Sequence, residues 1–376
     1  MTTRRESPEG RGDSISKRIQ LAGGPRVSIR LAGAPDSALR KDGTALGRYR
    51  GVVEIARGGM GIIYSGEDPD LNRAVALKLL PGGEKSDPDD LRKFLTEVQI
   101  TGQLEHPNIV PVHELGVEDG IGPFLVMKRI LGRSLKQELQ EIGAGTSHAS
   151  AEKQLARLLG VFVKVCEAVS YAHSHGVLHR DLKPDNVMVG DFGEVVVMDW
   201  GLAKVVGAAE PGGETTGAAP AGGSESGGMT LAGEVLGTPM YMSPEQALGR
   251  IDALDARSDV YSLGALLYEI LALQVPFECG DVRQLLLRVS RGTFRPPRER
   301  SRAPWTIPRE IESVALRAMA ADPAARYPSA AALKEDVEAW FAGRRLAAAH
   351  YSMWDLVGLW VKRNRAAVCT GTAAAI

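Results

Sequence analysis

Cysteine is scarce in this chain, which has three among its 376 residues. The three lie far apart and form no Cys-x-x-Cys pair. This argues against a disulfide framework and against a cysteine-based zinc site, and it is typical of a protein in a reducing compartment. Residues 1–50 also lack an apolar run long enough for a secretory signal peptide, so we expect a cytoplasmic protein.

A strong excess of charge is lacking as well. The chain has 45 basic and 46 acidic residues and a net charge of −1, which gives no indication of a nucleic-acid or polyanionic partner. The exception is the N-terminal stretch, because residues 1–50 hold 11 Lys/Arg and only 5 Asp/Glu. Residues 1–48 are rich in Gly, Ser, Pro and Arg and poor in aromatics. We predict a disordered basic arm there, which serves either as a solvated tail or as a weak electrostatic tether.

Apolar residues, in contrast, are plentiful. They make up 44% of the chain, against 24% for charged residues. A chain of this length and composition is expected to form two or three domains around a large buried core. We expect ordered structure to begin at Tyr49.

Residues 179–186 combine the side chains that phosphoryl transfer requires, in the sequence His-Arg-Asp-Leu-Lys-Pro-Asp-Asn. Asp181 can accept a proton from a hydroxyl, Lys183 can neutralise a phosphate and Asn186 can hold a divalent metal. The alternative is a charged surface turn between a helix and a strand. Such a turn is a poor explanation for eight residues in this specific order.

This stretch resembles the catalytic loop H-R-D-L-K-P-x-N of the Hanks-type (eukaryotic-type) serine/threonine protein kinases of bacteria. The resemblance covers residues 49–342. It implies the bilobal protein-kinase fold of the α+β class, with a β-rich N-lobe and one helix at 49–127 and a mainly helical C-lobe at 131–342. It also implies ATP as the phosphate donor, Mg²⁺ as the metal with Mn²⁺ as an alternative, and Asp181 as the catalytic base.

A glycine-rich turn is expected between two strands, at 52–55 and 62–64. Glycine lets backbone N–H groups approach phosphates closely, although a plain hairpin is the alternative. By resemblance this turn covers ATP, yet Ala56 replaces the family's first Gly and Ile63 replaces its Val, so we expect altered nucleotide affinity. The ATP-binding residues expected here are Ile55, Ala56, Arg57, Gly58, Gly59, Met60, Gly61, Ile62 and Ile63.

A lysine interrupts the apolar run 74–80, which we predict to be a buried strand. A buried lysine needs a partner, whereas an edge lysine that points to solvent is the alternative. By resemblance Lys78 holds the α- and β-phosphates of ATP and pairs with Glu97. Glu97 falls in a predicted helix that Asp87 caps and Pro88 opens.

Residues 124–127 are predicted to form a further strand. By resemblance Met127 is the gatekeeper beside the adenine, and Lys128 to Ile130 form the hinge whose backbone hydrogen-bonds the base. The family more often has an acidic residue in place of Lys128. Recognition through the backbone does not depend on that side chain.

Two tripeptides compete for the role of the metal-binding Asp-Phe-Gly motif. Residues 191–193 match it literally, but they lie between two valine-rich runs, and a Gly/Asp-rich segment in that position is typical of a hairpin turn. Residues 199–201 follow the second run and have Trp200 in place of Phe. We therefore predict that the first tripeptide is a turn and that Asp199, together with Asn186, holds the metal.

The segment after the second tripeptide is unusual, because residues 205–249 contain no Lys or Arg and residues 207–228 contain eight Gly and five Ala. We expect a long, flexible activation loop with an insertion at 205–230. By resemblance Arg180 pairs with a phosphorylated residue of this loop, and Thr230 is the first candidate. Weaker candidates are Thr215, Thr216, Ser224 and Ser226.

Further matches define the expected framework of the C-lobe. The segment that contains Thr238 resembles G-T-x-x-Y-x-x-P-E, so Thr238 is expected beside the catalytic loop, a feature of Ser/Thr rather than Tyr specificity. By resemblance Glu245 pairs with Arg326, and Asp259 anchors the backbone of the catalytic loop.

The C-terminal residues resemble the cytoplasmic edge of a membrane span. Residues 343–365 contain Trp354 and Trp360 and end in a basic cluster, and residues 366–376 carry no charge. Such a short run cannot cross a bilayer, which needs about 20 residues. Two alternatives stay open. One is a juxtamembrane segment followed by the beginning of a span, which would place the kinase at the cytoplasmic face of the inner membrane, and the other is a soluble tail.

We expect a signalling Ser/Thr kinase that phosphorylates protein hydroxyls and its own activation loop, with a homodimer for phosphorylation in trans. The main alternative is an ATP-binding pseudokinase scaffold, and another is a small-molecule kinase of related fold. The pseudokinase reading is disfavoured because competent residues occupy the core positions, namely Lys78, Glu97, Asp181, Asn186 and Asp199.

Overall fold

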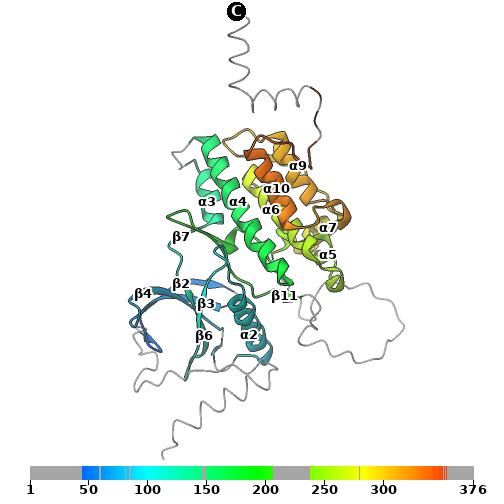
Figure 1. Ribbon diagram of the computed structural model, residues 1–376. Coiled ribbons are helices and arrows are strands. Elements are labelled where there is room, and N and C mark those ends of the chain that lie inside the picture. Colours follow the sequence, from blue (N-terminus) through cyan, green and yellow to red (C-terminus); the bar gives the residue numbers. More distant parts are fainter. Residues whose placement is uncertain are drawn as a thin grey trace, which may run out of the picture. The chain divides into compact units, whose positions relative to one another are not determined.

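The computed structural model describes residues 45–58, 61–80, 82–83, 86–145, 150–205, 238–278, 280–349, 351 and 353 (Figure 1). The chain divides into two compact units. Unit 1 comprises Met1–Gly132 and Gly190–Ala219, and unit 2 comprises Arg133–Val189 and Pro220–Ile376. The first is built around an antiparallel sheet and the second from helices, so the protein-kinase fold class expected from the sequence is confirmed.

Unit 1 contains a six-stranded sheet in the order β1-β2-β3-β4-β6-β5. Val75, Ala76 and Leu77 are buried, which explains why the apolar run around them is an interior strand. In the antiparallel register Lys78 lies between Ile63 and Leu125, so it belongs to the middle of the sheet rather than to an edge. The strands are β1 (Ala45–Leu46), β2 (Tyr49–Gly58), β3 (Gly61–Asp68), β4 (Arg73–Leu79), β5 (Val112–Glu118) and β6 (Gly122–Lys128).

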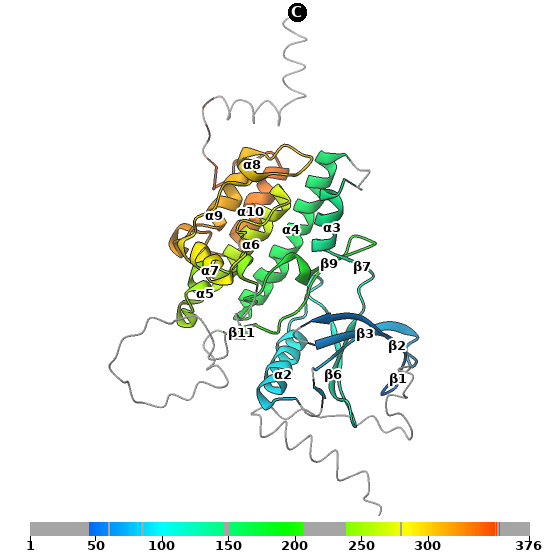
Figure 2. The ribbon, with the colours of Figure 1, turned by 180° about the vertical axis from the view of Figure 1, so that it is seen from behind.

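Helix α2 (Pro88–Gln103) packs on this sheet (Figure 2). The predicted N-cap is confirmed, because the Asp87 side chain accepts a hydrogen bond from the Asp89 backbone N–H at 2.8 Å, which satisfies one of the free donors of the first turn. The apolar face of the helix is buried against the sheet residues Leu80 and Leu125. That face consists of Leu91, Phe94, Leu95 and Val98.

Unit 2 is organised around helix α6 (Ala256–Ala272), in which every residue from Ser258 to Ala272 is buried. A helix that is largely apolar all round must lie inside a core, and α6 packs against α4, α9 and α10 (Figure 2). The other helices are α3 (Leu135–Gly143), α4 (Ala151–Ser174), α5 (Pro244–Ala247), α7 (Val282–Arg291), α8 (Pro297–Arg300), α9 (Arg309–Ala318) and α10 (Ala330–Phe341).

The remaining elements are short. The strands are β7 (Gly132–Ser134), β8 (Val177–Leu178), β9 (Val187–Gly190), β10 (Val195–Val197) and β11 (Lys204–Val205). The 3₁₀ turns are η2 (Pro184–Asn186), η3 (Pro239–Tyr241), η4 (Ile251–Ala253) and η5 (Pro323–Ala325).

Two predicted boundaries are wrong. The disordered arm was expected to reach residue 48, yet β1 pairs with β2, Leu46 is buried, and the Arg48 guanidinium lies 2.8 Å from the Glu114 carboxylate. The expected glycine-rich turn is shorter than predicted, since β2 continues to Gly58 and pairs with β3 along residues 56–58. Burial of an apolar side chain and cross-strand pairing outweigh the local composition in both places.

Several predictions fall on residues outside the described ranges. They concern residues 1–44 of the arm, Gly59 and Met60 of the glycine-rich turn, the loop residues 206–237 with Thr230, and the tail from residue 354 onward. Within the described ranges no helix combines the length and the apolar character needed to cross a membrane.

Candidate active site

Three side chains of unit 1 meet at the predicted nucleotide-binding lysine. The Lys78 ammonium lies 2.6 Å from Glu97 Oε1 and 3.3 Å from Asp199 Oδ1. Lys78 comes from β4, Glu97 from the buried face of α2, and Asp199 from the segment after β10. Lys78 is 6% exposed, so the alternative of an edge lysine that points to solvent is excluded, and its partner Glu97 is equally buried, at 6% exposure.

The electrostatics of this cluster favour a charged lysine. Burial alone would lower the pKa of the Lys78 ammonium, but the carboxylates of Glu97 and Asp199 outweigh burial and hold this pKa above its ordinary value. Burial and the negative charge of Asp199 raise the pKa of the Glu97 carboxyl, while Lys78 opposes the rise. A fixed positive charge in a buried position is suited to binding phosphate oxygens.

An apolar cluster in unit 1 surrounds the predicted gatekeeper. Met127 is 3% exposed and packs with Ala76, Val110 and Val196, and three partly buried side chains pack against this group. An apolar bed with few polar groups is the usual lining for a flat heterocycle such as adenine. The partly buried members are Ile63, Ile130 and Met198.

The first predicted hinge residue is held by unit 1 at both its backbone and its side chain. The Lys128 backbone N–H donates to the Pro111 carbonyl at 2.9 Å, and the Lys128 ammonium lies 2.8 Å from the Glu194 carboxylate. The Lys128 side chain, which is unusual for the family at this position, is therefore paired with Glu194. The Lys128 N–H is already bonded within unit 1, so the predicted recognition of adenine would have to use other backbone atoms of the hinge.

The two competing Asp-aromatic-Gly tripeptides occupy different surroundings. Residues 191–193 form a turn, as predicted, in which the Gly190 N–H donates to the Glu194 carbonyl at 2.8 Å and the Phe192 side chain is fully exposed. Strand β10 then bonds to the chain before β5, with Val197 N–H donating to the Asn108 carbonyl at 2.8 Å. Asp199 follows directly and reaches Lys78, while the next side chain, Trp200, is 1% exposed.

The catalytic-loop residues of unit 2 form a compact hydrogen-bonded group. Lys183 Nζ lies 2.6 Å from Asp181 Oδ2 and 3.0 Å from Thr238 Oγ1, and the Thr238 backbone N–H donates to Asp181 Oδ1 at 3.1 Å. The Asn186 amide nitrogen donates to the Asp181 carbonyl at 2.9 Å and to Asp181 Oδ2 at 3.3 Å. Both of these bonds use the amide nitrogen of Asn186, and an amide oxygen is a ligand that suits a hard cation.

A buried carboxylate binds the backbone of the catalytic loop. Asp259, at the start of α6, is 1% exposed and accepts the backbone N–H groups of His179 at 2.8 Å and Arg180 at 2.9 Å. The His173 ring nitrogen Nε2 lies 2.8 Å from the same carboxylate. Burial would raise the pKa of the Asp259 carboxyl, but His173 and these N–H donors outweigh burial and hold it below its ordinary value. No pattern in the sequence around His173 predicted this contact with Asp259.

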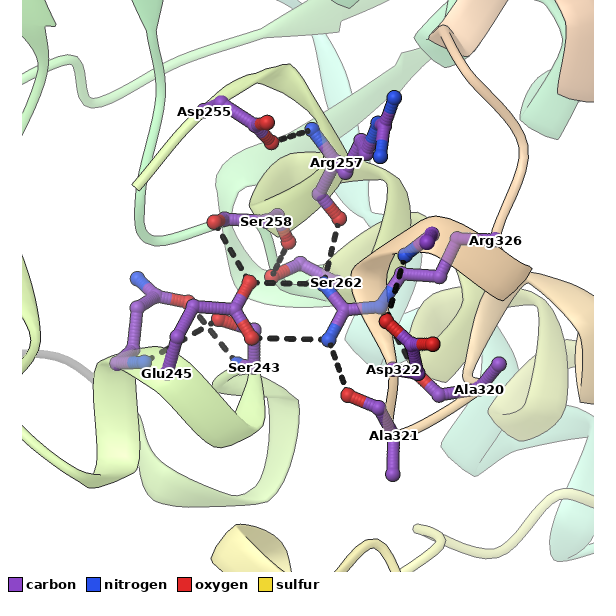
Figure 3. Close-up of polar contacts among 12 residues, drawn as sticks. Ser243, Glu245, Asp255, Arg257, Ser258, Ser262, Ala320, Ala321, Asp322 and Arg326 are labelled. Atoms are coloured by element: carbon purple, nitrogen blue, oxygen red, sulfur yellow. Dashed lines mark hydrogen bonds and ion pairs between the residues drawn. The ribbon is translucent and has the colours of Figure 1, made fainter. Parts of the chain in front are cut away.

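Glu245 and Arg326 form the buried pair shown in Figure 3. The guanidinium donates to both carboxylate oxygens, at 2.7 and 2.8 Å, and the Ser258 hydroxyl adds a third bond at 2.7 Å. Burial alone would raise the pKa of the Glu245 carboxyl, but Arg326 outweighs burial and lowers it. Because the folded-state pKa is depressed, this pair stabilises the fold above the ordinary carboxyl pKa, and its contribution is lost as the pH falls through the depressed value.

Phosphoryl transfer requires two groups of side chains, and both are present. Unit 1 holds the buried Lys78 with its carboxylate partners, and unit 2 holds the catalytic loop with Asp181, Lys183 and Asn186. Comparison with known sequences agrees. Residues 49–337 match the family described as "Protein kinase domain". The match spans most of the chain, and the chain therefore belongs to the protein kinase family, whose members use ATP and a divalent metal ion.

The chain is also similar to bacterial proteins named "Serine/threonine-protein kinase PknD". It is 36% identical to that of Protochlamydia amoebophila (strain UWE25) over 302 residues, which are 79% of this chain and 30% of the relative. It is 36% identical to that of Chlamydia pneumoniae over 301 residues, 79% of this chain and 31% of the relative. It is 37% identical to that of Chlamydia caviae over 298 residues, 77% of this chain and 31% of the relative. The chain thus spans about a third of the length of these relatives.

Proposed function

We propose that this chain is a serine/threonine protein kinase that transfers the γ-phosphate of ATP to protein hydroxyls. The observation that carries the proposal is the hydrogen-bonded group of Asp181, Lys183, Asn186 and Thr238 in a chain of the protein kinase family. A surface loop without a catalytic role gains little from ordering a carboxylate, an ammonium and an amide within hydrogen-bond distance of one another.

The nucleotide is proposed to bind through unit 1. Lys78, fixed by Glu97, neutralises the α- and β-phosphates, and the apolar cluster around Met127 contacts the adenine. Asp199 and Asn186 supply the carboxylate and amide oxygens that suit a divalent ion, with Mg²⁺ the expected ion and Mn²⁺ an alternative. When bound, the ion offsets negative charge on the phosphates.

The transfer step is proposed to depend on Asp181. Its carboxylate accepts the proton of the attacking hydroxyl, while the Thr238 N–H and the Lys183 ammonium hold that carboxylate in one orientation. Lys183 also offsets the charge that develops on the transferred group. The contact between Lys183 and Thr238 supports Ser/Thr specificity over Tyr specificity.

Regulation and location are proposed on the sequence features alone. Arg180 is a suitable partner for a phosphate on Thr230, so we expect autophosphorylation of the loop, in trans within a homodimer. The basic cluster and uncharged C-terminal run suit attachment at the cytoplasmic face of the inner membrane.

The test is transfer of labelled phosphate from ATP to a generic basic protein. Wild-type chain with Mg²⁺ should label the protein, whereas Asp181→Asn and wild type with excess EDTA should not. Asn has nearly the same shape as Asp, so this control removes the base and keeps the packing. ATP binding without transfer in the wild type would favour the pseudokinase alternative and refute the proposal.

A further inference from the structure

The chain does not detach from unit 2 where α10 ends. Residues 344–349 lie against that helix: the Arg344 N–H donates to the Ala339 carbonyl at 2.8 Å, and Leu346 is 5% exposed. The Ala347 and Ala348 N–H groups donate to Asp336 Oδ1 at 2.7 Å and Oδ2 at 2.9 Å. The match to the kinase family ends at residue 337, so this docked segment, termed the added segment, lies C-terminal to the matched residues.

Asp336 joins the added segment to the interior of unit 2. Its carboxylate is 6% exposed and accepts a third hydrogen bond, at 2.7 Å, from the Tyr327 hydroxyl. Tyr327 is itself 1% exposed, and the Arg317 guanidinium lies over its ring at 4.4 Å. Burial and the bond to Asp336 raise the pKa of the Tyr327 phenol, so its hydroxyl is a permanent donor. The tail backbone and Tyr327 therefore share one fixed acceptor.

The residue next to Tyr327 is Arg326, whose surroundings appear in Figure 3. Arg326 is 3% exposed, and its guanidinium uses all five N–H donors. Two of them donate to Glu245 and three donate to backbone carbonyls. Any displacement of the Arg326 side chain therefore breaks at least one hydrogen bond. The carbonyls are those of Ala320 at 2.8 Å, Arg257 at 2.9 Å and Ala321 at 3.1 Å.

The residue next to Glu245 reaches the catalytic loop. Gln246 Nε2 donates to the Arg180 carbonyl at 2.8 Å, and Gln246 Oε1 accepts the Ser243 N–H at 2.9 Å. Arg180 has a backbone φ of 68°, which is strained for a residue other than glycine. Asp259 holds its N–H and Gln246 holds its carbonyl, and these two bonds keep the strained backbone that immediately precedes Asp181.

We propose that Asp336 is a positioning residue for phosphoryl transfer. Asp336 fixes the added segment to Tyr327 and so keeps the neighbouring Arg326 in place against Glu245. Gln246, which follows Glu245, then holds the Arg180 carbonyl. Each link is a hydrogen bond or a peptide bond within unit 2, and a contiguous network of this kind can carry coupling between distant residues. Release of residues 344–349 therefore loosens the catalytic loop and lowers kcat.

The test compares full-length variants by steady-state kinetics and by amide hydrogen exchange. Asp336→Ala removes all three bonds, and the milder Tyr327→Phe removes only the hydroxyl link. We expect Asp336→Ala to lower kcat about five- to tenfold, which is within the range of coupling energies found for residues along a contiguous network. The KM for ATP should stay within about twofold. Exchange should become faster at the amides of residues 179–181 as well as 344–349. Tyr327→Phe should show the same pattern with a smaller amplitude.

Matched controls separate positioning from loss of stability. Leu333→Ala removes a fully buried apolar side chain from the same helix, so it should lower Tm while kcat, measured well below Tm, stays unchanged. Glu335→Gln, an exposed acid on α10, should change neither quantity. In the double variant Asp336→Ala/Gln246→Ala, kcat should be no lower than in Gln246→Ala alone, because both act on the Arg180 carbonyl.

The inference is overturned if Asp336→Ala leaves kcat and the exchange of residues 179–181 unchanged, if Leu333→Ala lowers kcat as much, or if the two losses in the double variant multiply. The kinetic readout rests on the proposed function, whereas the exchange readout needs no ATP. A wild-type chain without transferase activity would therefore refute the proposed function and leave the exchange test of Asp336 intact.

Discussion

Two tripeptides eight residues apart, Asp191–Gly193 and Asp199–Gly201, show how position decides the use of nearly identical sequence. The first forms a turn in which Phe192 is fully exposed. In the second, Asp199 lies 3.3 Å from the buried ammonium of Lys78, and Trp200 is 1% exposed. The imperfect match reaches Lys78, the lysine predicted to bind the nucleotide, whereas Asp191 of the literal match donates its backbone N–H to the Leu131 carbonyl.

The same two segments differ in where they carry a left-handed backbone. In the turn the residue with positive φ is Gly193, at 80°, for which this conformation costs little. In the second segment it is Asp199 itself, at 61°, which is strained for a side chain that has a Cβ. Strain at such a residue persists only where the surroundings over-determine it, and it is typical of functional sites. Substitutions in both segments test whether their positions in the fold decide their different roles.

The largest difference is expected for the two aspartates. Asp199→Ala should lower phosphate transfer by at least about a thousandfold, because it removes the carboxylate proposed to bind the metal and one partner of Lys78. Asp191→Ala, in the exposed turn, should retain activity within about twofold. The measurement is labelled-phosphate transfer to a protein substrate, and the reverse ranking of the two variants would show that the tripeptides have been assigned the wrong way round.

The next difference is expected in stability. Trp200→Ala should lower the free energy of unfolding by about 3–5 kcal/mol, because a large buried ring leaves a cavity. Phe192→Ala should change it by less than about 0.5 kcal/mol, since the ring is in solvent. Trp200→Phe serves as the control that keeps an aromatic ring in the family's usual form. Equal denaturant midpoints for the two alanine variants would contradict the burial of Trp200.

A smaller effect is expected for the turn glycine. Gly193→Ala should lower stability by about 1 kcal/mol, because a Cβ is disfavoured at a φ of 80°. Apart from Gly193 and its two chain neighbours, no residue has a heavy atom within 4 Å of the position of the added Cβ, so the cost is conformational and not a clash with distant residues. Thermal unfolding measures the change, and Gly193→Asn should be tolerated better than Ala. A Gly193→Ala variant as stable as wild type would argue against this turn geometry.

The smallest effect is expected for the ion pair between Lys128 and Glu194. Both side chains are partly in solvent, at 44% and 37% exposure, so Glu194→Gln should lower stability by less than about 1 kcal/mol and less still at high salt. The KM for ATP should stay within about twofold, because the pair uses a side chain and not the hinge backbone. A large rise in KM would mean that this pair positions the hinge.

Much of this site could be predicted from sequence because its motifs are local. The eight residues from His179 to Asn186 carry their chemistry within one loop, and the cap at Asp87 follows from short-range hydrogen-bonding rules. The assignment of Asp199 over Asp191 also followed from local pattern, since the valine-rich runs on either side of the turn indicated a hairpin.

The rest could not be predicted because it depends on contacts between distant residues. His173 lies 86 positions from Asp259 and carries no sign in its own neighbourhood that it will hold that carboxylate. Gln246 and Asp336 are likewise ordinary polar residues until the fold brings them to Arg180 and Tyr327. The extent of β1 was missed for a related reason, since a two-residue strand depends on its neighbour and not on its own composition.

The most direct test of the central claim is phosphosite mapping by mass spectrometry after incubation of the full chain with ATP and Mg²⁺. We predict phosphate on Ser or Thr residues in the wild type and none in Asp181→Asn. Equal phosphorylation of Asp181→Asn, or phosphate found only on Tyr, would contradict it.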